Sequence, residues 1–210
     1  RRFGSMRFVL ADPSVPNPTL IVGGVDTEAG AESNPEWLDY CATMVRTAQS
    51  RGGRTLVLTL SWRDTEALEQ RLLGVDNLLV QHRRQPLRPL LSMYRDVSRP
   101  NAVLISPGAW EGVDEPGRVN NLVITRIPFL PPNRLSQVHE RIHLSAKGYE
   151  ASRIDSLLAA RDMGKTRRKL EQGLGRGLRS PTDSVTVFIA DPRFPMPEAM
   201  QASLDPILMK

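Results

Sequence analysis

The sequence predicts an α/β domain of three layers, in which helices cover both faces of a mostly parallel central sheet. Two observations support this prediction. Short runs rich in Val, Ile and Leu recur along the 210 residues, and they are continuous rather than alternating, as is typical of strands buried on both faces. The segments between these runs mostly have the apolar spacing of helices, and alternating strands and helices indicate parallel crossover units.

The expected strands are six apolar runs, at residues 20–25, 55–60, 78–81, 102–106, 122–127 and 185–190. The expected helices lie at residues 35–50, 64–73 and 86–97, followed by a long helical stretch at residues 133–179. The first helix has the clearest limits, because Asn34 and Pro35 are typical of a helix start and Gly52–Gly53 of a helix end. We expect residues 1–210 to form one domain.

Composition limits the class of protein. Hydrophobic residues make up 40% of the chain but aromatic residues only 5%, so the core is expected to be aliphatic. The single cysteine, Cys41, excludes a disulfide framework and a four-cysteine metal site within the chain. No apolar run approaches the ~20 residues needed to cross a bilayer. We therefore expect a soluble, cytoplasmic protein without a membrane partner.

The positive charge of the chain is concentrated in one segment. The chain has 28 basic and 23 acidic residues, a net charge of +5, and 24 of the bases are Arg, whose planar fork grips phosphates at two points. Residues 161–179 contain seven bases and two acids, so this segment carries the whole excess. Such a focused patch favours a nucleotide or a nucleic acid as partner. The alternative is a solvated basic helix face.

Residues 139–143 read HERIH and match the H-E-x-x-H pattern of zinc hydrolases, in which two His on one helix face bind zinc and Glu140 acts as base. A catalytic zinc site needs a third protein ligand. The other histidine, His82, lies far upstream, so Glu150 or Asp155 would have to serve. A zinc hydrolase is therefore only a third alternative, and we expect an ordinary amphipathic helix and no metal site.

Residues 164–166 read GKT, like the end of a phosphate-binding loop. That loop requires a further glycine where this chain has Ala159, and a strand before it where residues 154–160 look helical. The sequence therefore predicts no ATP-cradling loop in this chain.

The strongest signal is the segment at residues 171–179, EQGLGRGLR. On a helix, Gln172, Arg176 and Arg179 would lie at i, i+4 and i+7 and share one face. The three glycines at residues 173–177 each cost a helix about 0.8–1 kcal/mol relative to Ala, and close approach of a ligand or another domain is the usual reason. Two guanidinium groups and an amide on one face would suit a triphosphate.

Four blocks of the sequence resemble superfamily 2 helicases of the DinG and XPD branch. Residues 172–179, QGLGRGLR, resemble the Q-x-x-G-R-x-x-R signature, motif VI. Residues 110–117, WEGVDEPG, resemble motif V, and LVITRIPFLPPN at residues 122–133 fits the segment that follows it. Residues 52–62 look like motif IV, and residues 185–193 are similar to the closing strand and its D-P-R. The blocks occur in the order of that family, which makes the resemblance specific.

The resemblance implies a RecA-like fold and the second motor domain of an ATP-dependent, 5′-to-3′ DNA helicase. The chain would be a fragment of a longer helicase, with the first motor domain absent. ATP and Mg²⁺ would be bound mainly by that first domain, and any iron–sulfur cluster would lie outside this chain. The expected partners are single-stranded DNA, the first motor domain and, in the CRISPR-associated type IV branch, a CRISPR ribonucleoprotein complex. The isolated fragment is expected to hydrolyse no ATP. The alternative is a stand-alone nucleic-acid-binding module without motor activity.

The resemblance also implies which residues face the nucleotide. Arg176 and Arg179 would reach the γ-phosphate as catalytic arginines. The other expected nucleotide-binding residues are Gln172, Gly175, Glu111 and Asp114. Of these, Glu111 and Asp114 would link the nucleotide cleft to the DNA track.

A second set of residues is expected to contact DNA. By the same resemblance, Ser61, Trp62 and Ser106 would lie against the DNA backbone. They follow or end predicted strands, and open α/β sheets bind ligands at the carboxyl ends of their strands.

Overall fold

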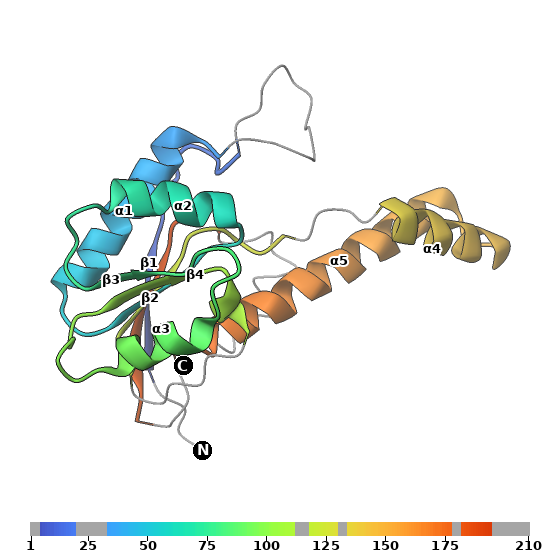
Figure 1. The fold of residues 1–210 in the computed structure, drawn as a ribbon. Coiled ribbons are helices and arrows are strands. Elements are labelled where there is room, and N and C mark those ends of the chain that lie inside the picture. The colour runs from blue at the N-terminus through green and yellow to red at the C-terminus, as the bar shows by residue number, and fades with distance from the viewer. Residues whose placement is uncertain (1–4, 20–32, 112–117, 130–133, 178–181, 195–210) are drawn as a thin grey trace.

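The computed structural model describes residues 5–19, 33–111, 118–129, 134–177 and 182–194 (Figure 1). Its six strands form one sheet in the order β1-β6-β5-β2-β4-β3, and every neighbouring pair is parallel. The strands are β1 (Ser5–Leu10), β2 (Thr55–Leu58), β3 (Leu78–Val80), β4 (Val103–Ser106), β5 (Asn121–Ile124) and β6 (Ser184–Ile189). The helices are α1 (Pro35–Ser50), α2 (Trp62–Arg71), α3 (Leu87–Arg95), α4 (Arg134–Ala146) and α5 (Ala151–Leu174), with a 3₁₀ turn η1 (Gly108–Trp110). The predicted α/β class with a parallel sheet is confirmed.

Helices cover both faces of this sheet. Figure 1 shows α1 and α2 on one side, and α3 with the C-terminal end of α5 on the other. Strand β2 illustrates the layering, because its side chains alternate between two buried clusters. Leu56 and Leu58 pack with the α3 and α5 cluster, whereas Val57 packs with the α1 and α2 cluster. All three side chains are fully buried, as a strand in the centre of a three-layer domain requires.

Helices α4 and α5 form an arm that extends away from the sheet (Figure 1). At about 1.5 Å per residue, the 24-residue α5 is about 36 Å long. Its C-terminal part buries Leu170 and Leu174 in the main core. Ile154 and Leu158, near its other end, are also buried. The single helical stretch expected at residues 133–179 is therefore two helices, separated by a turn in which Gly148 has a φ of +83°.

The other predicted elements agree with the structure except at the N-terminal strand. The expected run at residues 20–25 lies outside the described residues. Strand β1 was not predicted, because it lies at the edge of the sheet, is only partly buried and carries Ser5 and Arg7 among its apolar residues. The limits of α1 are confirmed: the Asn34 side chain accepts a hydrogen bond from the Glu36 N–H, and Gly52 has a φ of +79°. Within the described residues, no helix is long and apolar enough to span a membrane.

Candidate functional site

The side chain of Trp110 joins three segments that are distant in the sequence. It ends η1, directly after β4, and its indole Nε1 donates a 2.7 Å hydrogen bond to the carbonyl of Thr59 at the end of β2. Its ring lies so close to Gly173 of α5 that a Cβ there would come within 2.4 Å of it. Its own carbonyl accepts hydrogen bonds from Nε and Nη2 of Arg176, at 3.1 and 2.7 Å. Three of the motif segments therefore meet at one tryptophan.

The packing around Trp110 also explains the glycines. A Cβ at Gly173 would collide with the indole, and one at Gly177 would come within 2.9 Å of the Val185 side chain of β6. The expectation that a ligand or another domain requires these two glycines is therefore wrong. They make room for side chains of this domain, which allows α5 to lie against η1 and the sheet.

Helix α5 ends before it reaches Arg176. Its last residue is Leu174, and Gly175 is the C-cap. The next two N–H groups, of Arg176 and Gly177, donate to carbonyls only three residues back, at 3.0 and 3.1 Å. The expected helical alignment of Gln172 with Arg176 is therefore wrong beyond the cap. Gln172 is exposed on the last turn, and Arg176 is partly buried in the turn that follows.

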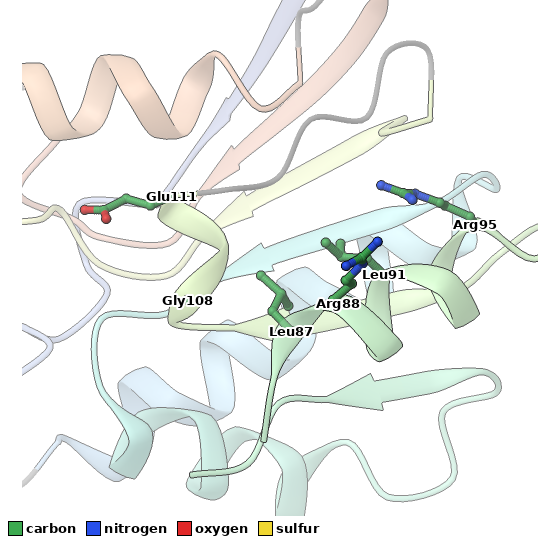
Figure 2. Close-up of a pocket in the computed structure, with 6 residues that line it drawn as sticks. All are labelled: Leu87, Arg88, Leu91, Arg95, Gly108 and Glu111. Carbon is green, nitrogen blue, oxygen red and sulfur yellow. The ribbon is translucent and has the colours of Figure 1, made fainter. Parts of the chain in front are cut away.

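Two predicted site residues cannot be placed. Arg179 and Asp114 lie outside the described residues, so their roles stay predictions. Glu111, beside Trp110, is exposed and follows η1. It borders a pocket between η1 and α3 (Figure 2).

Acidic side chains within the arm compensate part of the basic segment. Arg161 forms ion pairs with Glu140 of α4 and with Asp162, and Lys165 lies 3.6 Å from Asp162. In the next turn, Arg167 donates a 2.8 Å hydrogen bond to Glu171. Lys169 lies 5.9 Å from the centroid of the Trp110 ring, within the range of a cation–π contact. For Arg161 and Lys165, the interpretation as an ordinary charged helix face fits the structure.

The two predicted DNA-binding serines lie in different surroundings. Ser61 is the N-cap of α2, where its Oγ accepts a 3.0 Å hydrogen bond from the Asp64 N–H, and it is partly buried, as is Trp62 in the first helical position. Ser106 is completely buried at the end of β4, and its hydroxyl donates to Oε1 of Gln81 at 2.5 Å. A side chain without exposed surface offers no contact to DNA, so this structure does not support the role expected for Ser106.

The end of β6 is tied to the end of β5 by a buried carboxylate. Asp191 accepts a 2.8 Å hydrogen bond from the Ile127 N–H and binds the guanidinium fork of Arg193 at 2.8 and 2.6 Å. The same guanidinium lies 4.7 Å from the ring centroid of Phe129. The D-P-R block of the sequence therefore has a structural role that its resemblance did not indicate.

Arg126, which follows β5, also connects segments that are distant in the sequence. Its guanidinium lies 4.6 Å from the Trp37 ring centroid and 3.5 Å from the carboxylate of Asp64. Its other acceptors are the Pro18 carbonyl, Thr19 Oγ1 and Ser33 Oγ, at 3.0–3.1 Å. Burial lowers the pKa of Arg126, and the Asp64 carboxylate opposes that shift. Arg126 thereby connects residues 18–19 and Ser33 to the segment that follows β5.

The motifs for zinc and for a phosphate loop gain no support. Residues 164–166 lie inside α5 rather than after a strand. His139 and His143 are exposed on α4, and Glu140 between them is ion-paired with Arg161. In the described part of the chain, no group of three or more His, Cys, Asp or Glu side chains is arranged to hold a metal ion.

Comparison with known families decides the class of the domain. Residues 44–206 match the profile of the helicase C-terminal domain. The chain belongs to this family. No curated protein sequence matches this helicase C-terminal domain.

Three solved structures with the same fold are of XPD proteins. An XPD helicase structure has a TM-score of 0.63 and 17% identity, over 100% of this chain and 35% of its own. The Xpd4 structure from S. tokodaii has a TM-score of 0.60 and 18% identity, over 95% of this chain and 37% of its own. An apo XPD structure has a TM-score of 0.54 and 17% identity, over 93% of this chain and 38% of its own. The predicted RecA-like fold of the XPD type is confirmed, and the chain spans little more than a third of these structures.

Proposed function

We propose that this helicase C-terminal domain is the second motor half of an ATP-dependent DNA helicase that moves 5′ to 3′. In this proposal, Arg176 and Arg179 reach the γ-phosphate of ATP, which the first motor domain binds together with Mg²⁺. Single-stranded DNA passes along the carboxyl edge of the sheet, beside Ser61 and Trp62. The observation that supports this proposal best is the fixed position of Arg176 at the end of α5.

The geometry at Arg176 fits such a role. The carbonyl of Trp110 holds two of its N–H donors, which sets the orientation of the guanidinium plane. The side chain is only partly buried, so a ligand on a neighbouring domain has access to it. A cation that is oriented in advance stabilises the charge that develops during phosphoryl transfer without reorganising at that moment. Gln172, exposed one turn earlier, provides an amide on the same end of the helix.

Trp110 physically links the expected nucleotide-binding residue Arg176 to the loop after β2, where DNA is expected to bind. It is bonded to Thr59, two residues before Ser61, and to Arg176. In our proposal, a shift of the α5 end when nucleotide binds is transmitted through the indole to the loop after β2. The contact is rigid, because the ring fills the space that Gly173 leaves open.

The test is Arg176→Ala in the intact helicase, which is this chain joined to its first motor domain. We expect DNA-stimulated ATP turnover to fall about 10³-fold while the domain stays folded at the assay temperature, because arginine fingers contribute about 10³–10⁵ to turnover. Arg176→Lys should rescue poorly, since an ammonium lacks the two-point fork. The matched control is Arg153→Ala, an exposed residue of α5 that makes no ion pair among the described residues. Turnover of Arg176→Ala within a few-fold of the parent would reject the assignment.

A second measurement separates the motor from a mere binding module. The isolated 210-residue chain should release no phosphate from ATP above a mock preparation, with or without single-stranded DNA. The intact protein should do so. If the intact protein binds DNA but has no turnover, the domain is a nucleic-acid-binding module.

A further inference from the structure

The turn that follows β3 is held by two glutamines. Gln81, the first residue after the strand, is 7% exposed, and its Nε2 donates a 3.0 Å hydrogen bond to the Gln85 carbonyl. The side chain of Gln85 accepts a 3.1 Å bond from the His82 N–H, and its own N–H donates to the His82 carbonyl at 3.0 Å. The two ends of the turn at residues 82–85 are therefore bonded to one another.

Arg84 lies in this turn with a backbone conformation that disfavours a side chain. Its φ is +63°, and the third position of such a turn is usually occupied by Gly or Asn. The side chain is exposed and makes no hydrogen bond or ion pair with any residue that the structure describes. Strained backbone of this kind is concentrated at ligand-binding sites. Arg84 is therefore a candidate for contact with a ligand.

A buried contact fixes the turn to the neighbouring strand. Oε1 of Gln81 accepts a 2.5 Å hydrogen bond from the hydroxyl of Ser106, at the end of β4. Gly108 of η1 lies so near this oxygen that a Cβ there would come within 2.8 Å of it. Ser106 offers no surface to DNA, but through Gln81 it sets the position of the turn.

The turn lies at the same edge of the sheet as the expected DNA contacts. Strand β4 separates β3 from β2, so the carboxyl ends of β2 and β3 are two strand spacings, about 10 Å, apart. Ser61 and Trp62 follow the end of β2. Open α/β sheets bind ligands at this edge, so a DNA strand that contacts Ser61 and Trp62 passes close to the turn.

The local charge favours an anion. Residues 77–88 contain three Arg and no acidic residue. On the adjacent α2, Glu66 lies 3.6 Å from Nε of Arg83, and Glu69 lies 3.5 Å from Nε2 of His82. These carboxylates face the neighbours of Arg84 and form no ion pair with Arg84 itself. Its guanidinium fork is left for phosphate oxygens, which such a fork binds at two points.

We propose that Arg84 binds a phosphate of single-stranded DNA and that Gln81 is the positioning residue of the turn that carries it. The identity of the ligand rests on the proposed function, in which DNA passes along this edge. The fixed turn and its unpaired guanidinium do not depend on that function.

Anisotropy of a labelled (dT)₁₂ strand, titrated with the 210-residue chain, tests the contact. Arg84→Gln should weaken binding about tenfold at low salt, the usual cost of losing a hydrogen bond to a charged group. The slope of log affinity against log salt should become shallower by about 0.7, the value for one phosphate of a single strand. Arg153→Gln removes the same charge from the arm and should leave both quantities unchanged. Parental affinity in Arg84→Gln would overturn the proposal, and so would a parent chain that does not bind (dT)₁₂ at about 50 mM salt.

Two further variants separate a ligand contact from a role in the fold. Arg84→Gly suits the positive φ, so the melting temperature should not fall although DNA binding weakens as in Arg84→Gln. Arg84→Lys keeps one positive charge, so the salt slope should stay parental while the two-point fork is lost. A lower melting temperature in Arg84→Gly would mean that the side chain supports the fold, and would overturn the proposal.

A double-variant cycle tests the positioning role of Gln81. Gln81→Met removes both side-chain hydrogen bonds and should weaken DNA binding in the parent chain but not in Arg84→Gln. Gln85→Ala removes only the bond to the His82 N–H and provides the same cycle if Gln81→Met does not fold. Additive losses would overturn the positioning role. ATP turnover of the intact helicase, and its loss in Arg176→Ala, are measured independently, so the turn and the motor function fail separately.

Discussion

Arg193 and Arg88 both follow the carboxyl ends of strands, but their surroundings differ. Arg193 pairs with Asp191, whose carboxylate has no exposed surface, although the arginine itself remains 36% exposed. Arg88 lies on the pocket wall without a carboxylate partner among the described residues. The first arginine neutralises a charge of its own domain, and the second presents its charge outward. The role of an arginine therefore depends on whether an acidic side chain of the same domain faces it.

The largest effect on stability is expected at Arg193, which pairs with a buried carboxylate of its own domain. Arg193→Met should destabilise the chain by about 3 kcal/mol, because it leaves the buried charge of Asp191 uncompensated. Urea unfolding gives the free energy. The double variant Arg193→Met with Asp191→Asn should recover part of the loss, since the orphan charge is gone. Arg141→Met breaks the exposed pair with Asp155 and should cost less than about 1 kcal/mol. Equal losses in the two single variants would remove the distinction between buried and exposed pairs.

Two glycines of α5 allow a similar comparison, because one is tightly packed and the other has free space around it. Gly173→Ala forces a methyl group into the Trp110 ring and should destabilise the chain by about 1–3 kcal/mol. Gly164→Ala, in the middle of the same helix, meets only the end of the Arg168 side chain at 3.8 Å and should stabilise it by up to about 1 kcal/mol through helix propensity. Thermal unfolding followed by tryptophan fluorescence measures both. The interpretation of Gly173 as a packing residue is wrong if both substitutions stabilise.

Ser61 caps helix α2 and is also expected to contact DNA, and substitutions can separate the two roles. Ser61→Ala removes the N-cap of α2 and should cost about 1 kcal/mol of stability. Ser61→Asp keeps a good cap but places a negative charge at the expected DNA track. It should therefore preserve stability and weaken (dT)₁₂ binding, as measured by unfolding and by anisotropy. Unchanged DNA binding in Ser61→Asp would leave the serine with its capping role alone.

The smallest effect on stability is expected at the outward-facing arginine. Arg88→Gln should change the free energy of unfolding by no more than about 0.5 kcal/mol, as for other surface substitutions without a partner. Urea unfolding beside Arg193→Met tests this directly. A loss comparable to that of Arg193→Met would mean that Arg88 serves the fold rather than a ligand.

Much of the fold follows from local sequence because the information is local. Strands β2, β4 and β5 are buried on both faces, so each appears as a continuous apolar run that needs no knowledge of its neighbours. Helix α1 begins at Pro35 because the Asn34 side chain accepts a hydrogen bond from the free N–H of Glu36, and this too involves only nearby residues. The motif blocks are also contiguous, and they led to the family that the profile match then confirmed.

Only the tertiary structure decided what individual residues in those blocks do. Trp110 is 51 residues from Thr59 and 66 from Arg176, so no spacing rule relates them. The burial of Ser106, the room made by Gly173 and the pairing of Arg193 with Asp191 likewise depend on which groups meet when the layers pack. Backbone conformation responds to near neighbours, whereas burial and charge compensation respond to everything within a few ångströms. The sequence alone therefore determined the class of the domain, and packing determined which of its charges are left for a ligand.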